Sequence, residues 1–124
     1  MAFEASFNKQ HNYLSVKYDK LPAVEELDSS IKAFLQSGRY QADVNILFDM
    51  TTVCLSLLDR AMIDRLLSIR EKYPERGSAK IAILVSRDVD FGLGRMYGTL
   101  SERLEQRIMI FRDREQAELW IGES

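Results

Sequence analysis

Three glycines have the spacing that most resembles a cofactor-binding motif. Gly92, Gly94 and Gly98 follow an apolar run, and glycines placed after a buried strand let backbone N–H groups approach a dinucleotide pyrophosphate. In such a motif the glycines begin within a residue or two of the strand, whereas residues 87–91 intervene here. Gly94 and Gly98 are four residues apart and share one helical face. We therefore predict that they are points of close helix packing, with no cofactor at this loop.

Two neighbouring acids are the best candidates for acid–base chemistry. Asp88 and Asp90 are close enough in sequence to perturb one another's pKa. The structural interpretation is that both cap a helix that begins near Phe91. A catalytic carboxylate pair is the alternative.

One histidine and one cysteine leave little scope for metal or thiol chemistry. His11 falls in a polar turn without a second ligand nearby, which predicts a solvated side chain and no metal site. Cys54 lies in the apolar stretch VCL and is predicted to be a packed, inert thiol. Because a single cysteine cannot form an intramolecular disulfide, the composition favours a reducing, cytoplasmic compartment.

Length and composition fit a single domain over residues 1–124. The chain is 46% hydrophobic, which is sufficient for a core without disulfides or metal. Its 17 Lys and Arg are interspersed with 19 Asp and Glu, for a net charge of -2, so we expect no nucleic-acid partner. No stretch approaches the roughly 20 apolar residues that cross a bilayer, and the first residues lack the features of a signal peptide. We therefore expect no membrane span.

Strand and helix patterns alternate along the sequence. Segments 3–8 and 13–18 flank a polar turn and predict an antiparallel hairpin with one wet face. Further strands are predicted at 44–50, 81–85 and 108–111. Helices are predicted after Pro22 until Gly38, from 56 to 73, from about 91 to 104, and after Asp113 until Gly122. The order β-β-α-β-α-β-α-β-α predicts an α/β fold with a mixed, mostly parallel sheet of about five strands and four helices.

Four stretches together carry a resemblance to a known family. They are the opening hairpin, ILFDM at 46–50, AILVSRDVDFGLGRMY at 82–97 and IFRDREQAELWI at 110–121. These stretches resemble the SpoIIAA-like branch of the STAS superfamily, which is related in fold to sporulation anti-anti-sigma factors and, more distantly, to lipid-carrying domains. None is a catalytic signature, so the resemblance implies a fold more directly than an activity.

The family's phosphorylation motif is the main point of departure. Anti-anti-sigma factors carry Asp-Ser-Ser-Gly at the start of a helix, and phosphorylation of one serine breaks a partner contact. Here residues 49–59 read DMTTVCLSLLD, which keeps the acidic strand end and lacks the motif. Ser56 and Asp59 instead have the spacing of a capping box, so we predict that Ser56 is an N-cap. Phosphorylation of Ser56, Thr51 or Thr52 stays open at this point.

The carboxyl ends of the predicted strands form the candidate surface, because ligands of open α/β sheets gather there. An apolar pocket with an arginine at its mouth would suit an amphiphilic or carboxylated ligand, since a guanidinium binds a carboxylate in bidentate fashion. Alternatively, the arginines pair with Asp88 and Asp90, and Phe91 belongs to the core. The candidate residues are Asp49, Met50, Thr51, Ser56, Arg87, Asp88, Phe91, Arg95 and Met96.

Two further features are candidates for contacts with other chains. The helix predicted from 57 to 73 has more apolar positions than one face needs, because Leu57, Ile63 and Leu67 widen its stripe. This surplus suggests a homodimer surface. Trp120 is either a partner contact or a cover for the sheet edge.

These observations favour a non-enzymatic regulatory or protein-interaction module that lacks the Asp-Ser-Ser-Gly switch. The alternative is a carrier or sensor of a small apolar or amphiphilic molecule held beneath Phe91 and Met96. An enzyme that uses Asp88 and Asp90 is a third possibility, although no nucleophile, base and metal set is recognisable in the sequence.

Overall fold

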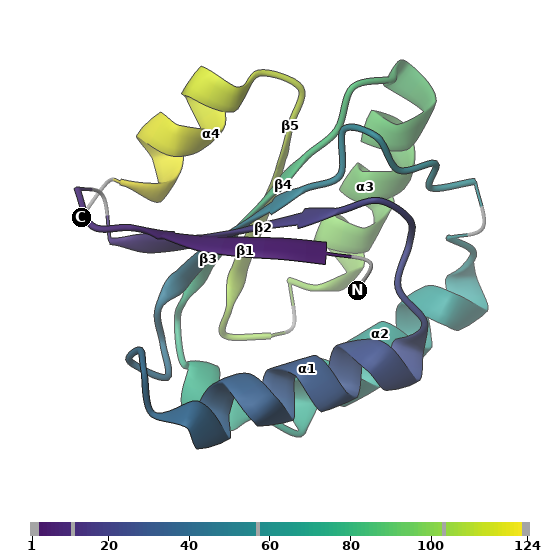
Figure 1. Ribbon diagram of the computed structural model, residues 1–124. Helices are drawn as coiled ribbons and strands as arrows, with labels where there is room; N and C mark the ends of the chain where they lie inside the picture. Colours follow the sequence, from purple (N-terminus) through teal and green to yellow (C-terminus); the bar gives the residue numbers. More distant parts are fainter. Residues whose placement is uncertain (1–2, 11, 57, 103, 123–124) are drawn as a thin grey trace.

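A computed structural model describes residues 3–10, 12–56, 58–102 and 104–122, and its strands form one five-stranded sheet (Figure 1). The strands are β1 (Phe3–Asn8), β2 (Tyr13–Tyr18), β3 (Asn45–Asp49), β4 (Lys80–Leu84) and β5 (Arg107–Phe111). They lie in chain order. β1 and β2 are antiparallel, whereas every other neighbouring pair is parallel. The predicted hairpin and mostly parallel sheet are therefore confirmed.

The helices cover the two faces of the sheet unequally. They are α1 (Val24–Ser37), α2 (Arg60–Glu71), α3 (Asp88–Leu100) and α4 (Arg114–Ile121), with a short 3-10 helix η1 (Pro74–Arg76) after α2. Figure 1 shows α1 and α2 together on one side of the sheet and α4 on the opposite side. α3 packs on the same face as α1 and α2, since its Tyr97 belongs to their apolar cluster. No helix in the described part of the chain has both the length and the apolar character that a bilayer span requires.

Alternation along the central strands builds a separate core on each face. Successive side chains of a strand point to opposite sides of the sheet. Ile46 and Ile81 face α1, α2 and α3, which we call the three-helix face. Leu47 and Ala82 face α4, which we call the single-helix face. Both central strands are therefore apolar on both sides, as their continuous apolar runs predict.

The start of α2 differs from the sequence prediction, whereas the start of α4 agrees with it. α2 begins at Arg60, because the Asp59 side chain accepts a hydrogen bond from the Met62 N–H at 2.8 Å. Ser56 precedes this cap and is exposed, so the predicted Ser56 N-cap is wrong. α4 begins as predicted, with Asp113 accepting a hydrogen bond from the Glu115 N–H at 2.8 Å.

α3, in contrast to α2, begins earlier than predicted, at Asp88 instead of near Phe91. Its N-cap is Arg87, and no side chain caps this helix end with a hydrogen bond. The predicted capping role of Asp88 and Asp90 is therefore wrong. The Asp90 side chain is buried and instead binds the Leu55 N–H and the Arg87 guanidinium.

Close helix packing is confirmed at one of the two predicted glycines. A Cβ atom on Gly94 would lie 3.0 Å from Ile110 Cγ2, which is too close for an ordinary contact. On Gly98 the nearest atom would be Ile108 Cγ2 at 3.9 Å, an ordinary van der Waals separation. The tight crossing of α3 over β5 therefore depends on Gly94 and not on Gly98.

Candidate functional site

An apolar cavity lies between the three-helix face and the helices that cover it. Its volume is about 120 Å³. The sheet contributes alternate residues of its central strands, including Ile46, Phe48, Ile81 and Ile83. The helices and the segments that flank them contribute Leu27, Ile31, Leu58, Met62, Leu66 and Tyr97. Because these walls come from every layer of the three-helix face, the cavity belongs to the interior of the fold.

Two arginines interrupt the apolar wall. Arg70 lies near the end of α2, and Arg76 is the last residue of η1. Both side chains line the cavity, and both residues are at least 94% buried. Buried charged groups are normally paired, because desolvation strongly penalises an isolated ion. Neither arginine forms an ion pair with a carboxylate in the described residues.

Arg70 satisfies its guanidinium with neutral groups. It donates to Gln106 Oε1 from Nε at 3.0 Å and from Nη2 at 2.8 Å. Its Nη1 donates to the Tyr97 hydroxyl at 2.9 Å and to Ser101 Oγ at 3.2 Å. Arg70 therefore fixes α2 to α3 and to the approach of β5, and its positive charge remains beside the cavity.

Arg76 is less completely satisfied. Its Nη1 donates to the Ala42 carbonyl at 2.7 Å, and its Cζ lies 5.6 Å from the centre of the Phe34 ring. Its buried Nη2 has no hydrogen-bond partner. Burial, followed by the positive charge of Arg70, lowers the pKa of Arg76 to about 10. The side chain is still protonated at neutral pH, so a donor and a charge are both left partly uncompensated.

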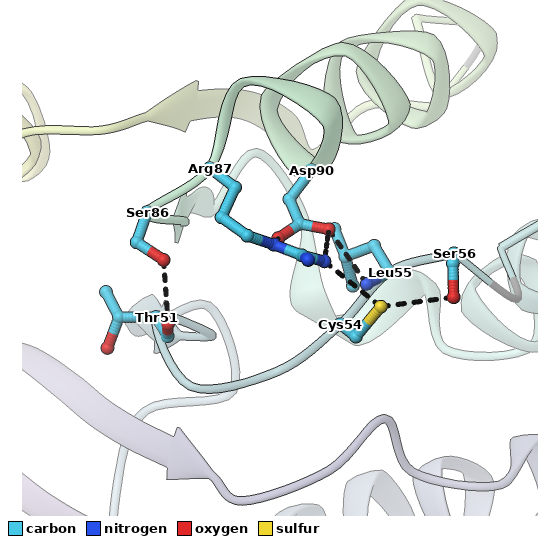
Figure 2. A network of polar contacts seen from close by, with 7 residues as sticks. All are labelled: Thr51, Cys54, Leu55, Ser56, Ser86, Arg87 and Asp90. Carbon is cyan, nitrogen blue, oxygen red and sulfur yellow. Dashed lines mark hydrogen bonds and ion pairs between the residues drawn. The ribbon is translucent and has the colours of Figure 1, made fainter.

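The segment from Met50 to Asp59, which we call the connecting segment, joins β3 to α2 and carries a polar cluster on its outer side (Figure 2). The buried Asp90 accepts a hydrogen bond from the Leu55 N–H at 2.9 Å and pairs with Arg87 Nε at 2.7 Å. The Arg87 hydrogen bond holds the pKa of Asp90 below its usual value; burial opposes this shift. This carboxylate therefore ties the connecting segment to the start of α3.

Cys54 lies at the edge of this cluster and is exposed, so its prediction as a packed, inert thiol is wrong. Its Sγ is 3.1 Å from Ser56 Oγ and 3.0 Å from Arg87 Nη2. The hydrogen bonds of Ser56, and then that of Arg87, lower the pKa of the thiol. At neutral pH a larger fraction of this thiol is therefore ionised to the thiolate than in a free cysteine.

Asp49 and Thr51 belong to a second polar group near the end of β3. Asp49 Oδ1 accepts hydrogen bonds from the Thr51 N–H at 3.0 Å and hydroxyl at 2.6 Å, and its Oδ2 lies 3.1 Å from Arg114 Nη1. Burial alone would raise the pKa of Asp49, but the contacts with Thr51 and Arg114 lower it on balance. The Thr51 carbonyl also accepts a hydrogen bond from Ser86 Oγ at 2.8 Å (Figure 2).

The remaining candidate residues lie along α3, outside the cavity. Asp88 pairs with Arg112, and the Phe91 ring lies 4.9 Å from Arg112 Cζ and 5.9 Å from Arg95 Cζ. Met96 is exposed. Of the nine predicted surface residues, only Met50 lines the cavity, so the structure does not bring the predicted set together at one pocket.

The apolar surplus of α2 is internal. Ile63 is 0% exposed and Leu67 is 1% exposed, so these two residues cannot form the exposed dimer surface that the sequence suggested. Leu57, the third residue of that set, and His11 lie outside the described residues. Trp120 is half-buried and packs against Phe111, with ring centres 5.8 Å apart, which favours the second of its two predicted roles, a cover for the sheet edge.

Comparisons with known proteins bear on the fold. No protein-family model matches the chain, and no curated protein matches it in sequence. The solved structures include an uncharacterized protein of the DUF3478 family from Shewanella loihica PV-4, which has a SpoIIAA-like fold. It superposes with a TM-score of 0.61 over 97% of this chain and 92% of that chain. The fold is SpoIIAA-like. The 18% sequence identity extends this SpoIIAA-like likeness to the fold alone.

The two buried arginines are functional candidates that the sequence prediction missed. Arg70 stands four residues after Leu66 and three before Tyr73, which places a charge inside the apolar stripe of its helix. That position was the available signal. Arg76 gave none, because the turn sequence PERG is typical of an exposed loop.

Proposed function

We propose that the chain is a non-enzymatic regulatory module in which a small apolar molecule, bound in the cavity, alters the polar surface of the connecting segment. The observation that carries the proposal is that this one segment has two sides. Met50, Leu55 and Leu58 line the cavity. Thr51 and Cys54 contact Ser86 and Arg87 at the protein surface.

The Leu55 residue supplies a direct mechanical link. Its side chain is part of the cavity wall, and its backbone N–H donates to the buried Asp90 carboxylate. A ligand that displaces the Leu55 side chain therefore acts on the hydrogen bond to Asp90 and on the Arg87 pair beyond it. A ligand can shift this equilibrium only by its difference in affinity for the two arrangements.

The non-enzymatic part of the proposal is supported by the state of the two candidate acids. Asp88 is paired with Arg112 at the surface, and Asp90 is buried and paired with Arg87. Each carboxylate thus has its own arginine, which suits structural ion pairs better than an acid–base couple. A SpoIIAA-like fold is also consistent with a protein-interaction role, in which the connecting segment is the proposed partner surface.

The test uses 1-hexanol as a neutral apolar ligand and amide hydrogen exchange as the readout. We expect saturable binding and a changed exchange rate at the Leu55 amide. The exchange rate of the Glu115 amide should not change, because this amide is bonded to Asp113 at the start of α4, on the opposite face of the sheet. Leu66→Phe should weaken hexanol binding by filling the cavity, whereas Leu119→Phe on the exposed face of α4 should not. Binding that leaves the Leu55 amide unchanged would contradict the proposal, as would a protein that binds neither 1-hexanol nor hexanoate, its carboxylate analogue.

A further inference from the structure

The cavity wall includes two buried, charged side chains that a purely apolar ligand does not explain. Arg76 is 5% exposed, its Nη2 lacks a hydrogen-bond partner, and Arg70 stands close enough to lower its pKa. The Phe34 ring and the Ala42 carbonyl compensate part of the guanidinium. A protonated, desolvated guanidinium with a free N–H still favours an anion beside it.

The described residues provide no such anion. Asp43 is the one acid that raises the pKa of Arg76, and its effect is smaller than those of burial and of Arg70. Asp43 is exposed and forms no ion pair with Arg76. The partners of Arg70, which are Gln106, Tyr97 and Ser101, are neutral. The positive potential of two arginines is therefore available to a ligand.

We infer that the cavity binds a small monocarboxylic acid, with its carboxylate on the Arg76 guanidinium and its apolar body against the walls of the cavity. This inference rests on the proposed function and names its ligand class. The planar guanidinium fork matches the geometry of a carboxylate. Arg70 adds long-range attraction and keeps its own neutral partners.

The size of the cavity limits the apolar body. An apolar cavity of about 150 Å³ accommodates a molecule the size of benzene. A volume of about 120 Å³ therefore suits a body of roughly five carbons, the number that hexanoate carries beyond its carboxylate. Hexanoate meets both requirements, and 1-hexanol has the same chain without the charge.

The experiment compares the dissociation constants of hexanoate and 1-hexanol by isothermal titration at pH 7. We expect hexanoate to bind at least about tenfold more tightly, because only its carboxylate brings a negative charge and two acceptor oxygens to the guanidinium. Arg76→Met, which removes the charge and keeps the length, should abolish this preference. Arg60→Met is the control: it makes the same change at an exposed position at the start of α2 and should leave the preference for hexanoate intact.

The outcomes separate the two proposals. Equal binding of hexanoate and hexanol by the wild-type protein would overturn the carboxylate inference and leave the cavity function standing. Binding of neither molecule would overturn both. A folded Arg76→Met protein that keeps the preference for hexanoate would overturn the assignment of the carboxylate to Arg76.

A measurement on the wild-type protein keeps the test decisive if Arg76→Met fails to fold. The Nε–H resonance of Arg76 should shift on saturation with hexanoate and should shift much less on saturation with hexanol. An Arg76 resonance that responds equally to both molecules, or to neither while hexanoate binds, would refute the inference.

Discussion

The two faces of the sheet differ in how completely their helices fill the space above the strands. On the single-helix face, Ala117 of α4 sits directly on Ala82 and Leu47, all with no exposed surface. On the three-helix face, larger side chains from three helices meet around a cavity that two buried arginines help to line. Small residues let one helix approach the sheet closely, whereas bulky residues from several helices leave space between them. This contrast separates a face that stabilises the fold from a face that can also bind.

Truncation of one leucine on each face should give the largest difference. Leu47→Ala should lower the free energy of unfolding by about 4 kcal/mol, because its site is fully enclosed. Leu66→Ala should cost about 2 kcal/mol, because Leu66 borders a cavity and has fewer contacts to lose. Urea unfolding of both variants checks the order. Equal losses would show that the two faces are packed alike.

Removal of the Asp90 charge tests the link between the connecting segment and α3. Asp90→Asn should destabilise by about 2 kcal/mol at neutral pH, since it weakens a buried, charge-assisted hydrogen-bond pair. The native pKa of Asp90 is lowered, so the wild-type advantage should be complete above the unfolded pKa of about 3.9 and should vanish as the pH falls through the native value. Urea unfolding between pH 2 and 7 measures this difference. An advantage that is independent of pH would contradict the ionised role of Asp90.

The tight crossing of α3 on the three-helix face can be probed at its glycines. Gly94→Ala should destabilise by about 1 kcal/mol, because the new Cβ would meet Ile110 at 3.0 Å. Gly98→Ala should be neutral or stabilising by up to about 1 kcal/mol, since its Cβ has room and alanine favours a helix. Thermal unfolding of the pair distinguishes them. Similar losses at both positions would restore the prediction that both glycines are close-packed.

The smallest expected effect is chemical. Alkylation of Cys54 by iodoacetamide should reach half its maximal rate at a lower pH than alkylation of a free cysteine, because Ser56 and Arg87 lower the pKa of the thiol. Arg87→Met should move that midpoint upward. A rate profile that is the same in both proteins would show that Arg87 does not stabilise the thiolate.

Sequence periodicity predicted the architecture well because both faces of the central strands are apolar and each helix has one apolar stripe. It failed where tertiary contacts decide the outcome. Cys54 has apolar neighbours in the chain, yet those neighbours turn inward and leave the thiol outside. Ile63 and Leu67 exceed the apolar residues that one helix face needs, but both are buried in the core of the three-helix face. The burial of Arg76 follows from the turn between α2 and β4, which no local pattern specifies.

Helix α4 follows all five strands in the chain and, among the described helices, is the one that covers the single-helix face. Its carboxyl end is fastened to the sheet by the Asn45 amide, which donates to the Ile121 carbonyl at 3.2 Å, and by Lys80 Nζ, which donates to the Trp120 carbonyl at 2.8 Å. During translation, the apolar surface around Leu47 and Leu84 therefore emerges from the ribosome before the element that shields it. A released chain that lacked α4 would expose this apolar surface on an otherwise complete sheet, which favours chaperone binding and aggregation.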